Sequence, residues 1–228
     1  HRDGGFAEYV VAPAEDCYIV NTDKISADMA CLVEPYSIGV QVNYRGEITA
    51  NDTVLVMGSG PIGICIMQVA KARGARVMMT DIVPERLALA LRAGADRVVD
   101  VRNEDLQAAV LEFAGGEGVS VACDSVCSLT SIPQAMDLVC PAGRVVVLGL
   151  KDKPSEIAQV AFTKKEVSVY GSRLNNYRFP EVISLFEDGR VHPEMIRSAA
   201  FRFEDVQQAF DLVMQHPEKI CKVSLLFE

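Results

Sequence analysis

One short segment of this 228-residue chain restricts its fold more than any other, because it places three glycines at the spacing G-x-G-x-x-G. The segment reads Gly58-Ser59-Gly60-Pro61-Ile62-Gly63. It follows five apolar or β-branched residues at 53–57, and it opens a helix-like segment at 61–73 that Gly74 ends. A strand, a tight glycine turn and a helix in this order are typical of the first unit of a parallel α/β sheet.

Each glycine of this segment has its own role in such a unit. Gly58 permits the tight turn, Gly60 lets a ligand approach the backbone, and Gly63 lets the helix pack closely on the strand. The helix that starts with Pro61 and Ile62 presents unpaired N–H groups at its N-terminus, where a pyrophosphate binds well. The segment therefore predicts a dinucleotide site formed by these five residues.

Asp81 ends the next predicted strand, 18 residues after Gly63. An acidic side chain at this place can accept both ribose hydroxyls of an adenosine and repels a 2′-phosphate, so the sequence favours NAD over NADP. The alternative is a solvated turn residue or a cap of the helix that begins at Pro84. Arg86 is expected either against the adenine or as an ordinary arginine on a helix surface.

Beyond this unit, strand-like and helix-like segments alternate along the chain. Strands are predicted at 53–57, 76–80, 97–100, 119–124, 144–148 and 167–170, and helices at 61–73, 84–92, 104–114 and 131–139. Strands that alternate with helices form right-handed βαβ units. The predicted fold class is α/β, a Rossmann-type doubly wound parallel sheet with helices on both faces. Leu148-Gly149-Leu150 ends one strand at the carboxyl edge, where such sheets bind ligands, although a plain strand exit is the alternative.

The segments on either side of this alternation have a different character. Residues 1–28 read as a glycine turn followed by short strands. After Gly171, amphipathic helices are predicted at 179–187 and 204–214, and a closing strand at 222–226. The histidines, His1, His192 and His216, are scattered, and no arrangement of catalytic side chains emerges from the residues alone.

Charge and composition exclude several classes of partner. The net charge is −9, from 22 basic and 31 acidic residues, so nucleic acids and anionic membranes are poor partners. Residues 53–70 are uncharged, but their glycines and Pro61 do not suit a continuous lipid-facing helix. The seven cysteines are an odd number without a C-x-x-C pair, which favours reduced thiols and a cytoplasmic location. Four of them are expected to pack as small hydrophobic residues, namely Cys31, Cys65, Cys123 and Cys140.

Several motifs together resemble one enzyme family over essentially the whole chain. They are Gly4-Gly5-Phe6-Ala7-Glu8-Tyr9, Val33-Glu34-Pro35-Tyr36-Ser37-Ile38-Gly39, Asp52-Thr53-Val54-Leu55-Val56 before the glycine segment, Gly171-Ser172-Arg173-Leu174-Asn175, and Cys221-Lys222-Val223. In these motifs the chain resembles the medium-chain, zinc-dependent alcohol and polyol dehydrogenases, in the branch of the sorbitol and L-galactonate enzymes.

The resemblance implies an enzyme of two domains that uses NAD and zinc. Residues 29–174 would form the NAD-binding domain, whereas 1–28 and 175–228 would be remnants of a GroES-like catalytic domain. The family implies a small polyol or sugar acid as substrate, a cytoplasmic location, and a homo-oligomer, dimer or tetramer, joined through an edge strand near 167–170. The flanking segments are then expected to expose apolar surface, because they lack part of their core.

The resemblance also assigns roles to individual residues. Glu34 matches a glutamate beside the zinc, bound directly or through water, although a carboxylate in the first turn of a helix is the alternative. Arg173 matches an arginine near cofactor and substrate, and Leu174 replaces an aromatic residue of sorbitol dehydrogenases, which disfavours sorbitol itself. The residues implied to contact NAD are Ile62, Asp81, Arg86, Leu148, Gly149, Leu150, Ser172 and Arg173.

Part of the family pattern is absent from this chain. The Gly-His-Glu motif and the cysteine quartet that bind zinc in the family are missing, and the chain starts with His1. We therefore expect a C-terminal fragment that is inactive alone, with its other zinc ligands upstream of His1. The alternatives are a zinc-free relative of the quinone-reductase type, a separate NAD-binding module, and a methyltransferase-like nucleotide fold.

Overall fold

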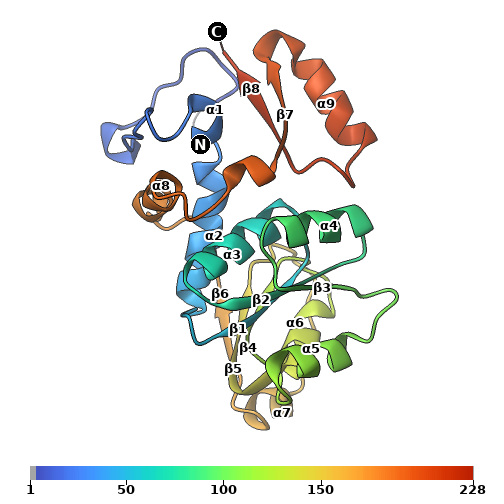
Figure 1. The fold of residues 1–228 in the computed structure, drawn as a ribbon. Coiled ribbons are helices and arrows are strands. Elements are labelled where there is room, and N and C mark those ends of the chain that lie inside the picture. Colours follow the sequence, from blue (N-terminus) through green and yellow to red (C-terminus); the bar gives the residue numbers. More distant parts are fainter. Residues whose placement is uncertain (1–3, 228) are drawn as a thin grey trace.

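The computed structural model describes residues 4–227, so His1 lies outside it, and its centre is a six-stranded parallel sheet (Figure 1). The strands follow the order β3-β2-β1-β4-β5-β6. This is the order of a doubly wound Rossmann sheet, which confirms the predicted fold class. The six strands are β1 Thr53–Met57, β2 Arg76–Asp81, β3 Arg97–Asp100, β4 Val119–Asp124, β5 Val139–Val147 and β6 Ser168–Gly171.

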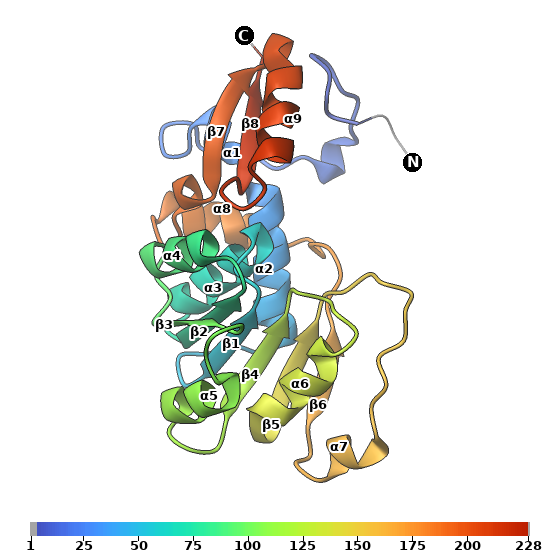
Figure 2. The ribbon, with the colours of Figure 1, turned by 90° about the vertical axis from the view of Figure 1, so that its right-hand side faces the viewer.

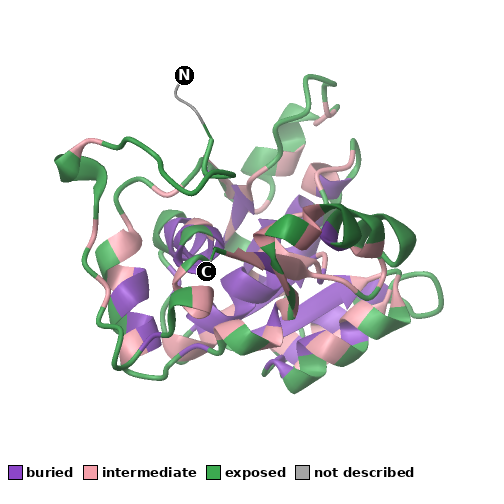
Figure 3. Cartoon of the chain, turned by 90° about the horizontal axis from the view of Figure 1, so that it is seen from above, coloured by how far each residue is buried: buried purple, intermediate pink, exposed green. Residues whose placement is uncertain are grey.

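Helices cover both faces of the sheet, and the alternating residues of the strands form two separate cores. Val54 and Val56 of β1 pack with α2 (Val33–Arg45), α3 (Pro61–Ala72) and α4 (Pro84–Arg92). Leu55 and Met57 of the same strand face α5 (Leu106–Ala114) and α6 (Ser131–Leu138). Figure 3 shows this buried interior between exposed outer surfaces. The central strands are buried on both sides, as parallel sheets require.

A second, smaller sheet stands at one end of the molecule (Figure 2). It pairs β7 (Arg197–Arg202) with β8 (Lys222–Leu226) in parallel, and α9 (Val206–Gln215) connects the two strands. The short α1 (Ala27–Ala30) contacts β8, and α8 (Phe179–Glu187) packs on α2. In the contact between α8 and α2, the rings of Tyr36 and Phe186 pack edge to face, with their centroids 5.0 Å apart. The remaining elements are α7 Gln159–Thr163 and the 3-10 turns Ala14–Asp16, Pro193–Met195 and Phe203–Asp205.

The short strands predicted for residues 1–28 are wrong over the described residues 4–28. This segment forms a 3-10 turn at Ala14–Asp16 and begins α1, but it contains no strand. Tyr9, Val11 and Ile19 are 90% or more exposed, so these side chains do not pack on the surface of a sheet. β-Branched and aromatic residues favour strands only where they pack on a sheet surface.

Several predicted boundaries shift for identifiable reasons. The helix expected at 104–114 begins at Leu106, because Asp105 caps it by accepting the N–H of Ala108. The helix expected at 204–214 begins at Val206, after a 3-10 turn. The strand expected at 144–148 begins at Val139 and ends at Val147, and it contains an irregularity at 141–143, where the pairing with β4 shifts register and Ala142 has a φ of 56°.

The flanking segments expose large apolar side chains, as expected from the sequence. Phe6 is 69% exposed and Met214 is 78% exposed. Phe6 and Phe210 form an edge-to-face pair at 6.4 Å, which joins the N-terminal segment to α9. Within residues 4–227, no helix has both the length and the apolar character that crossing a membrane requires.

Candidate functional site

The glycine segment between β1 and α3 has a different steric requirement at each glycine. Gly58 has a φ of +97°, which L side chains rarely adopt. A Cβ on Gly63 would lie 2.1 Å from the carbonyl oxygen of Gly58, so α3 could not pack this closely with any other residue. A Cβ on Gly60 would meet nothing within 4 Å, so open space lies over the backbone at this point.

The N-terminus of α3 faces a cavity of about 480 Å³ at the carboxyl edge of the sheet. Gly60 is the N-cap and Pro61 the first helical residue. The first helical hydrogen bond runs from the Ile64 N–H to the Gly60 carbonyl at 3.0 Å, so the N–H groups of Ile62 and Gly63 precede it. Unpaired N–H groups and the positive end of the helix dipole make such a terminus attractive to an anion.

Asp81 lies at the end of β2 on the wall of the same cavity. One carboxylate oxygen accepts the N–H of Ser59 at 2.9 Å, and the other accepts those of Ile82 at 2.7 Å and Val83 at 3.0 Å. Asp81 therefore joins the glycine segment to the turn that follows β2. It supports the local turn, as the alternative interpretation requires, and it also places a negative charge beside the cavity.

Arg86 lines this cavity from α4. Its Nη2 atom donates a hydrogen bond to the carbonyl oxygen of Pro217 at 2.9 Å, although the two residues lie 131 positions apart. Arg86 thus connects the sheet edge to the segment that leads into β8. The arginine therefore lies on a helix surface and also lines the cavity.

The loop after β4 and the first turn of α6 supply cavity residues that the sequence analysis missed. Ser125, Val126, Ser128, Ser131 and Gln134 line the cavity. This loop is held by Asp124, which is fully buried: its carboxylate accepts the N–H groups of Val126 and Cys127 and the hydroxyl of Ser131. The available signal was the Asp-Ser sequence at the end of the strand that pairs with β1, where the strand order reverses.

A second cavity of about 220 Å³ adjoins the first, and Ile62 and Ser125 line both. Its walls come from the glycine segment, the end of β5, the segment after β6 and α2. They bring together several residues that the sequence singled out, and the full lining is Ile38, Ile62, Ser125, Cys127, Leu148, Leu150, Ser172, Arg173 and Leu174. Gly149 lies between two of these residues and touches Cys127, since a Cβ on Gly149 would be 3.1 Å from that of Cys127.

The residues along the two cavities are chemically suited to a dinucleotide. The larger cavity has the anion-attracting helix terminus and open backbone at Gly60, with Asp81 at its side. The smaller one is mainly apolar, and Ser172 is among its lining residues. The combined volume falls within the ~300–1,000 Å³ that is usual for small-molecule and cofactor sites.

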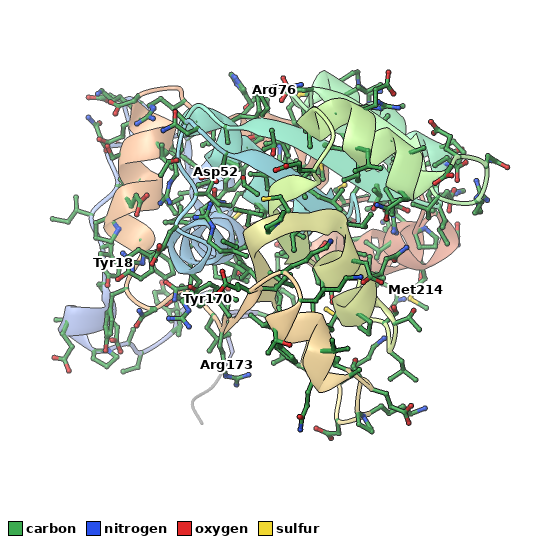
Figure 4. All side chains as sticks on the ribbon, turned by 90° about the horizontal axis from the view of Figure 1, so that it is seen from below. Tyr18, Asp52, Arg76, Tyr170, Arg173 and Met214 are labelled. Atoms are coloured by element: carbon green, nitrogen blue, oxygen red, sulfur yellow. The ribbon has the colours of Figure 1, made fainter. Side chains whose placement is uncertain are left out.

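Glu34 and Arg173, which the family resemblance places beside the zinc and near the substrate, respectively, line different cavities. Glu34 is exposed in the first turn of α2 and lines a separate cavity of about 470 Å³, together with Cys31 and Cys221. Within residues 4–227, no three side chains of the metal-binding types lie close enough to hold a metal ion, so these residues do not form a complete zinc site. Arg173 follows β6, close to Tyr170 (Figure 4), and borders both the smaller cavity and an open one that Arg45 also lines.

Only two of the four cysteines that were expected to pack as small hydrophobic residues are buried. Cys65 and Cys123 are buried, and burial raises the pKa of both thiols, that of Cys123 to about 12. Cys31 is exposed and Cys140 is intermediate, so the expectation that both pack as core residues is wrong. Cys127, in the smaller cavity, has a pKa raised by burial and by the nearby Asp124.

Comparison with known proteins finds relatives that match almost the whole of this chain. The chain is 36% identical to the starvation-sensing protein RspB of Escherichia coli K12, over all of this chain and 67% of RspB. It is 32% identical to an erythritol/L-threitol dehydrogenase of Mycolicibacterium smegmatis, over 98% of this chain and 62% of that protein. A solved structure of rspB from Escherichia coli CFT073 in complex with NADH superimposes with a TM-score of 0.93 over 99% of this chain and 66% of that one, at 36% identity.

The chain thus spans roughly two thirds of the length of these relatives. In addition, residues 61–188, which contain α3 to α8, match the protein family described as zinc-binding dehydrogenase. The glycine segment, the sheet order and these similarities agree, and this chain belongs to the zinc-binding dehydrogenase family.

Proposed function

We propose that this chain is the NAD-binding part of a dehydrogenase that oxidises a secondary hydroxyl of a polyol or sugar acid. The observation that carries the proposal is the pair of cavities that meet at Ile62 and Ser125. The larger one has the features that bind a pyrophosphate and an adenosine ribose, and the smaller one has room for a ring. A dinucleotide fits this division because its adenosine end carries a ribose and charged phosphates, whereas its nicotinamide end carries a flat ring.

Each end of the proposed site has its own residues. The N–H groups of Ile62 and Gly63 would hold the pyrophosphate, and Asp81 would accept the ribose hydroxyls, with Arg86 beside the adenine. Leu148, Gly149 and Leu150 would shield the nicotinamide end from water on the β5 side. When bound, NAD supplies the acceptor for the hydride that leaves the alcohol carbon. Arg173, at the outer border of the smaller cavity, would contact the substrate hydroxyls.

The substrate class rests on relatives and on one residue of this chain. Relatives named erythritol/L-threitol, sorbitol and L-galactonate-5-dehydrogenase support a polyhydroxylated substrate. Leu174, which lines the smaller cavity, supports a substrate other than sorbitol. Zinc is proposed for the intact enzyme on family grounds, with Glu34 as one carboxylate beside it. Residues 4–227 do not complete a metal site by themselves.

We also propose the division into domains at residues 28 and 174. The whole six-stranded sheet lies within 29–174, and the second sheet with its connecting α9 lies within 175–228. The exposed apolar side chains of both flanking segments support their assignment to an incomplete catalytic domain. The odd number of cysteines supports a cytoplasmic location.

Binding of NADH is the direct test of the proposed function. The chain contains no tryptophan, so the fluorescence of the nicotinamide itself can be followed without interference. We expect saturable binding of NADH that ADP-ribose displaces. Absence of NADH binding by a folded sample would contradict the proposal, and binding of S-adenosylmethionine instead would favour the methyltransferase-like alternative.

Exchange of Asp81 for asparagine tests which cofactor the site prefers. The Asp81→Asn variant keeps an oxygen for the turn N–H groups but removes the negative charge that repels a 2′-phosphate. We expect the preference for NADH over NADPH to fall by about tenfold, equivalent to about 1.4 kcal/mol. Titration of both nucleotides against both proteins measures this ratio. An unchanged ratio would show that Asp81 does not set the preference; Asp100→Asn, on the neighbouring edge strand β3, is the matched control.

A homo-oligomer joined through β6 is the proposed assembly. β6 is an edge strand of the sheet, and Val169 within it is 37% exposed. We expect Val169→Glu to shift the protein to a smaller species in sedimentation or light-scattering measurements, because a buried carboxylate would face its own copy across the interface. Leu91→Glu, at a 50% exposed site on α4, serves as control. Equal masses for all three proteins would exclude β6 as the interface.

A further inference from the structure

An open cavity of about 610 Å³ lies between α2 and the segment that follows β6. Arg45 and Arg173 line it, and none of its lining residues within 4–227 is acidic, although the chain as a whole has a net charge of −9. A hollow lined by charges of one sign attracts ions of the opposite sign. The proposed function uses only Arg173 of this cavity and leaves its other polar groups unexplained.

Gln41 is a buried polar residue of this cavity. It is 5% exposed, and its Oε1 atom accepts the Nε–H of Arg178 at 3.0 Å. This bond fixes the amide with its oxygen toward Arg178 and leaves the Nε2 atom without an acceptor among residues 4–227. Within that range, only Asn43 Oδ1 and Ser172 Oγ are both fully buried and unpaired, so the Gln41 Nε2 atom is still accessible. Gln41 therefore offers two N–H groups beside a space that a ligand can enter.

Arg45 lies one helical turn after Gln41, on the same face of α2. Its Nε atom donates to the carbonyl oxygen of Gly171 at 3.0 Å, and its guanidinium carbon lies 5.6 Å from the centroid of the Tyr170 ring. The Nη1 and Nη2 atoms have no acceptor among residues 4–227. A guanidinium that is already held at one nitrogen loses less side-chain entropy when its other nitrogens bind a ligand.

Arg173 is exposed and forms no hydrogen bond or ion pair with any of residues 4–227. Its segment is strained, because Leu174, Asn176 and Tyr177 have φ values of 50°, 39° and 61°. Residues other than glycine rarely adopt such angles, and those that do gather at binding and active sites. Arg173 and Leu174 line both this cavity and the smaller one, so a ligand can extend from one cavity into the other.

The three polar groups match one class of ligand. Two guanidinium groups and the amide nitrogen of Gln41 offer only donors, whereas a carboxylate or a phosphate offers several acceptors and the opposite charge. A neutral hydroxyl chain would leave both positive charges without a counter-charge. Because the adjoining smaller cavity is the proposed place of the nicotinamide, an anionic group in the open cavity suits the far end of a substrate.

We propose that Gln41, Arg45 and Arg173 bind the anionic group of the substrate, a carboxylate or a phosphate, and thereby select a sugar acid or a polyol phosphate over a neutral polyol. The role in substrate binding rests on the proposed function, whereas binding of the anion itself does not. Gln41 and Arg45 are then specificity residues outside the cofactor site. Such a site discriminates well, because a neutral analogue leaves its charged groups unpaired.

NMR titration of the whole chain tests this inference, since the side-chain amide signals of Gln41 report on the cavity directly. The probes are gluconate, sorbitol 6-phosphate and sorbitol, which share a six-carbon hydroxyl chain but differ in charge, and acetate, which is a carboxylate without that chain. We expect gluconate or sorbitol 6-phosphate to shift the Gln41 signals with saturation, and the tighter of the two identifies the anionic group. It should bind roughly fivefold or more tightly than sorbitol and acetate.

Two variants with matched controls locate the binding. Gln41→Glu keeps an oxygen for Arg178 but adds a negative charge to the cavity, and Gln107→Glu on α5 makes the same change of charge at an exposed residue. Arg173→Gln breaks no hydrogen bond or ion pair within residues 4–227, and Arg92→Gln at the end of α4 is its control. We expect Gln41→Glu and Arg173→Gln each to weaken the preferred anion by about tenfold, and both controls to bind as the wild type does.

The remaining outcomes contradict the inference in distinguishable ways. Equal affinity for the charged probes and sorbitol, or equal weakening in a control and its variant, would mean that these residues do not hold the anionic group. Acetate bound as tightly as gluconate would indicate an anion site that is separate from the substrate. If NADH binds normally but no anion does, this inference is wrong and the proposed function stands. If anions bind and NADH does not, the proposed function fails and takes the substrate role with it.

Discussion

Replacement of Gly63 by alanine is expected to abolish cofactor binding and to destabilise the fold. The new methyl group would lie 2.1 Å from the Gly58 carbonyl oxygen, and that neighbour is backbone, which cannot rotate away as a side chain can. Relief of the overlap requires α3 to move away from the turn after β1. Overpacking of this kind costs about 1–3 kcal/mol, and displacement of the helix terminus removes the geometry that an anion needs. Urea unfolding and NADH titration measure the two effects.

Gly60→Ala is the matched control for this prediction. The same methyl group at residue 60 meets nothing within 4 Å, and the backbone there has an ordinary φ of −72°. We expect the free energy of unfolding to stay within about 0.5 kcal/mol of that of the wild type. NADH affinity should nevertheless fall, because the methyl group projects into the space that the pyrophosphate would occupy. If Gly60→Ala binds NADH as tightly as the wild type, the phosphates do not approach the backbone at this point.

The second large effect is expected for Asp52, at the opposite edge of the sheet. Asp52 is 6% exposed, and its carboxylate accepts hydrogen bonds from Thr49, Ser120 and Arg144. Arg144 in turn donates to the carbonyl oxygens of Gly46 and Glu47. This network joins the end of α2 to the starts of β1 and β4 and to Arg144 in the second half of β5. Removal of one partner of a buried ion pair costs about 3–5 kcal/mol, so Asp52→Ala should lower the free energy of unfolding by about 3 kcal/mol.

The control for Asp52 is an exposed ion pair between β3 and α5. Arg97 and Glu112 meet at 2.6 Å, but the Glu112 side chain is 74% exposed, so Glu112→Ala should cost less than about 1 kcal/mol. Urea unfolding of the three proteins at pH 7 gives the comparison. Because Asp52 lies far from the glycine segment along β1, folded Asp52→Ala should retain the NADH affinity of the wild type. A loss of stability no larger than that of Glu112→Ala would show that the network contributes little.

The pH dependence of the same variant provides an internal check. Burial alone would raise the pKa of Asp52, but hydrogen bonds from Ser120 and Thr49 and the charge of Arg144 lower it below its ordinary value. A carboxyl whose pKa is lowered by folding stabilises the protein fully above its unfolded pKa of ~3.9. This contribution is lost as the pH falls through the lower, folded value. The difference in stability between wild type and Asp52→Ala should therefore be constant near neutral pH and shrink below about pH 4.

The parts of the fold that could be predicted from sequence are those that depend on local patterns. The apolar runs of β1 and β2, the glycine spacing and the prolines at the starts of α3 and α4 are all local, and the predicted elements there agree with the structure to within a residue. The fold class followed from the alternation of strands and helices, which forms right-handed βαβ units. For the site, the roles of Gly58 and Gly63 could be predicted because turn geometry and close packing act between residues near in sequence.

The parts that could not be predicted depend on contacts between distant residues. β7 pairs with β8 in parallel, and α9 connects the two strands. The local sequence of residues 197–202 does not indicate which strand pairs with β7. The loop after β4 lines the cavity because the fully buried Asp124 holds it, and burial is a tertiary property. Likewise, Ser172 is one serine among many in the sequence, and only the three-dimensional structure shows that its hydroxyl is buried without a partner among residues 4–227.

The hydrogen bond from Arg86 to the Pro217 carbonyl has a thermodynamic consequence. Arg86 also lines the larger cavity, so a ligand that drew its Nη2 atom away from Pro217 would release the approach to β8. Two equilibria that share one hydrogen bond are linked, and each shifts the other by the same factor. A change that strengthened the bond between Arg86 and Pro217 would then weaken the affinity for such a ligand by an equal free energy.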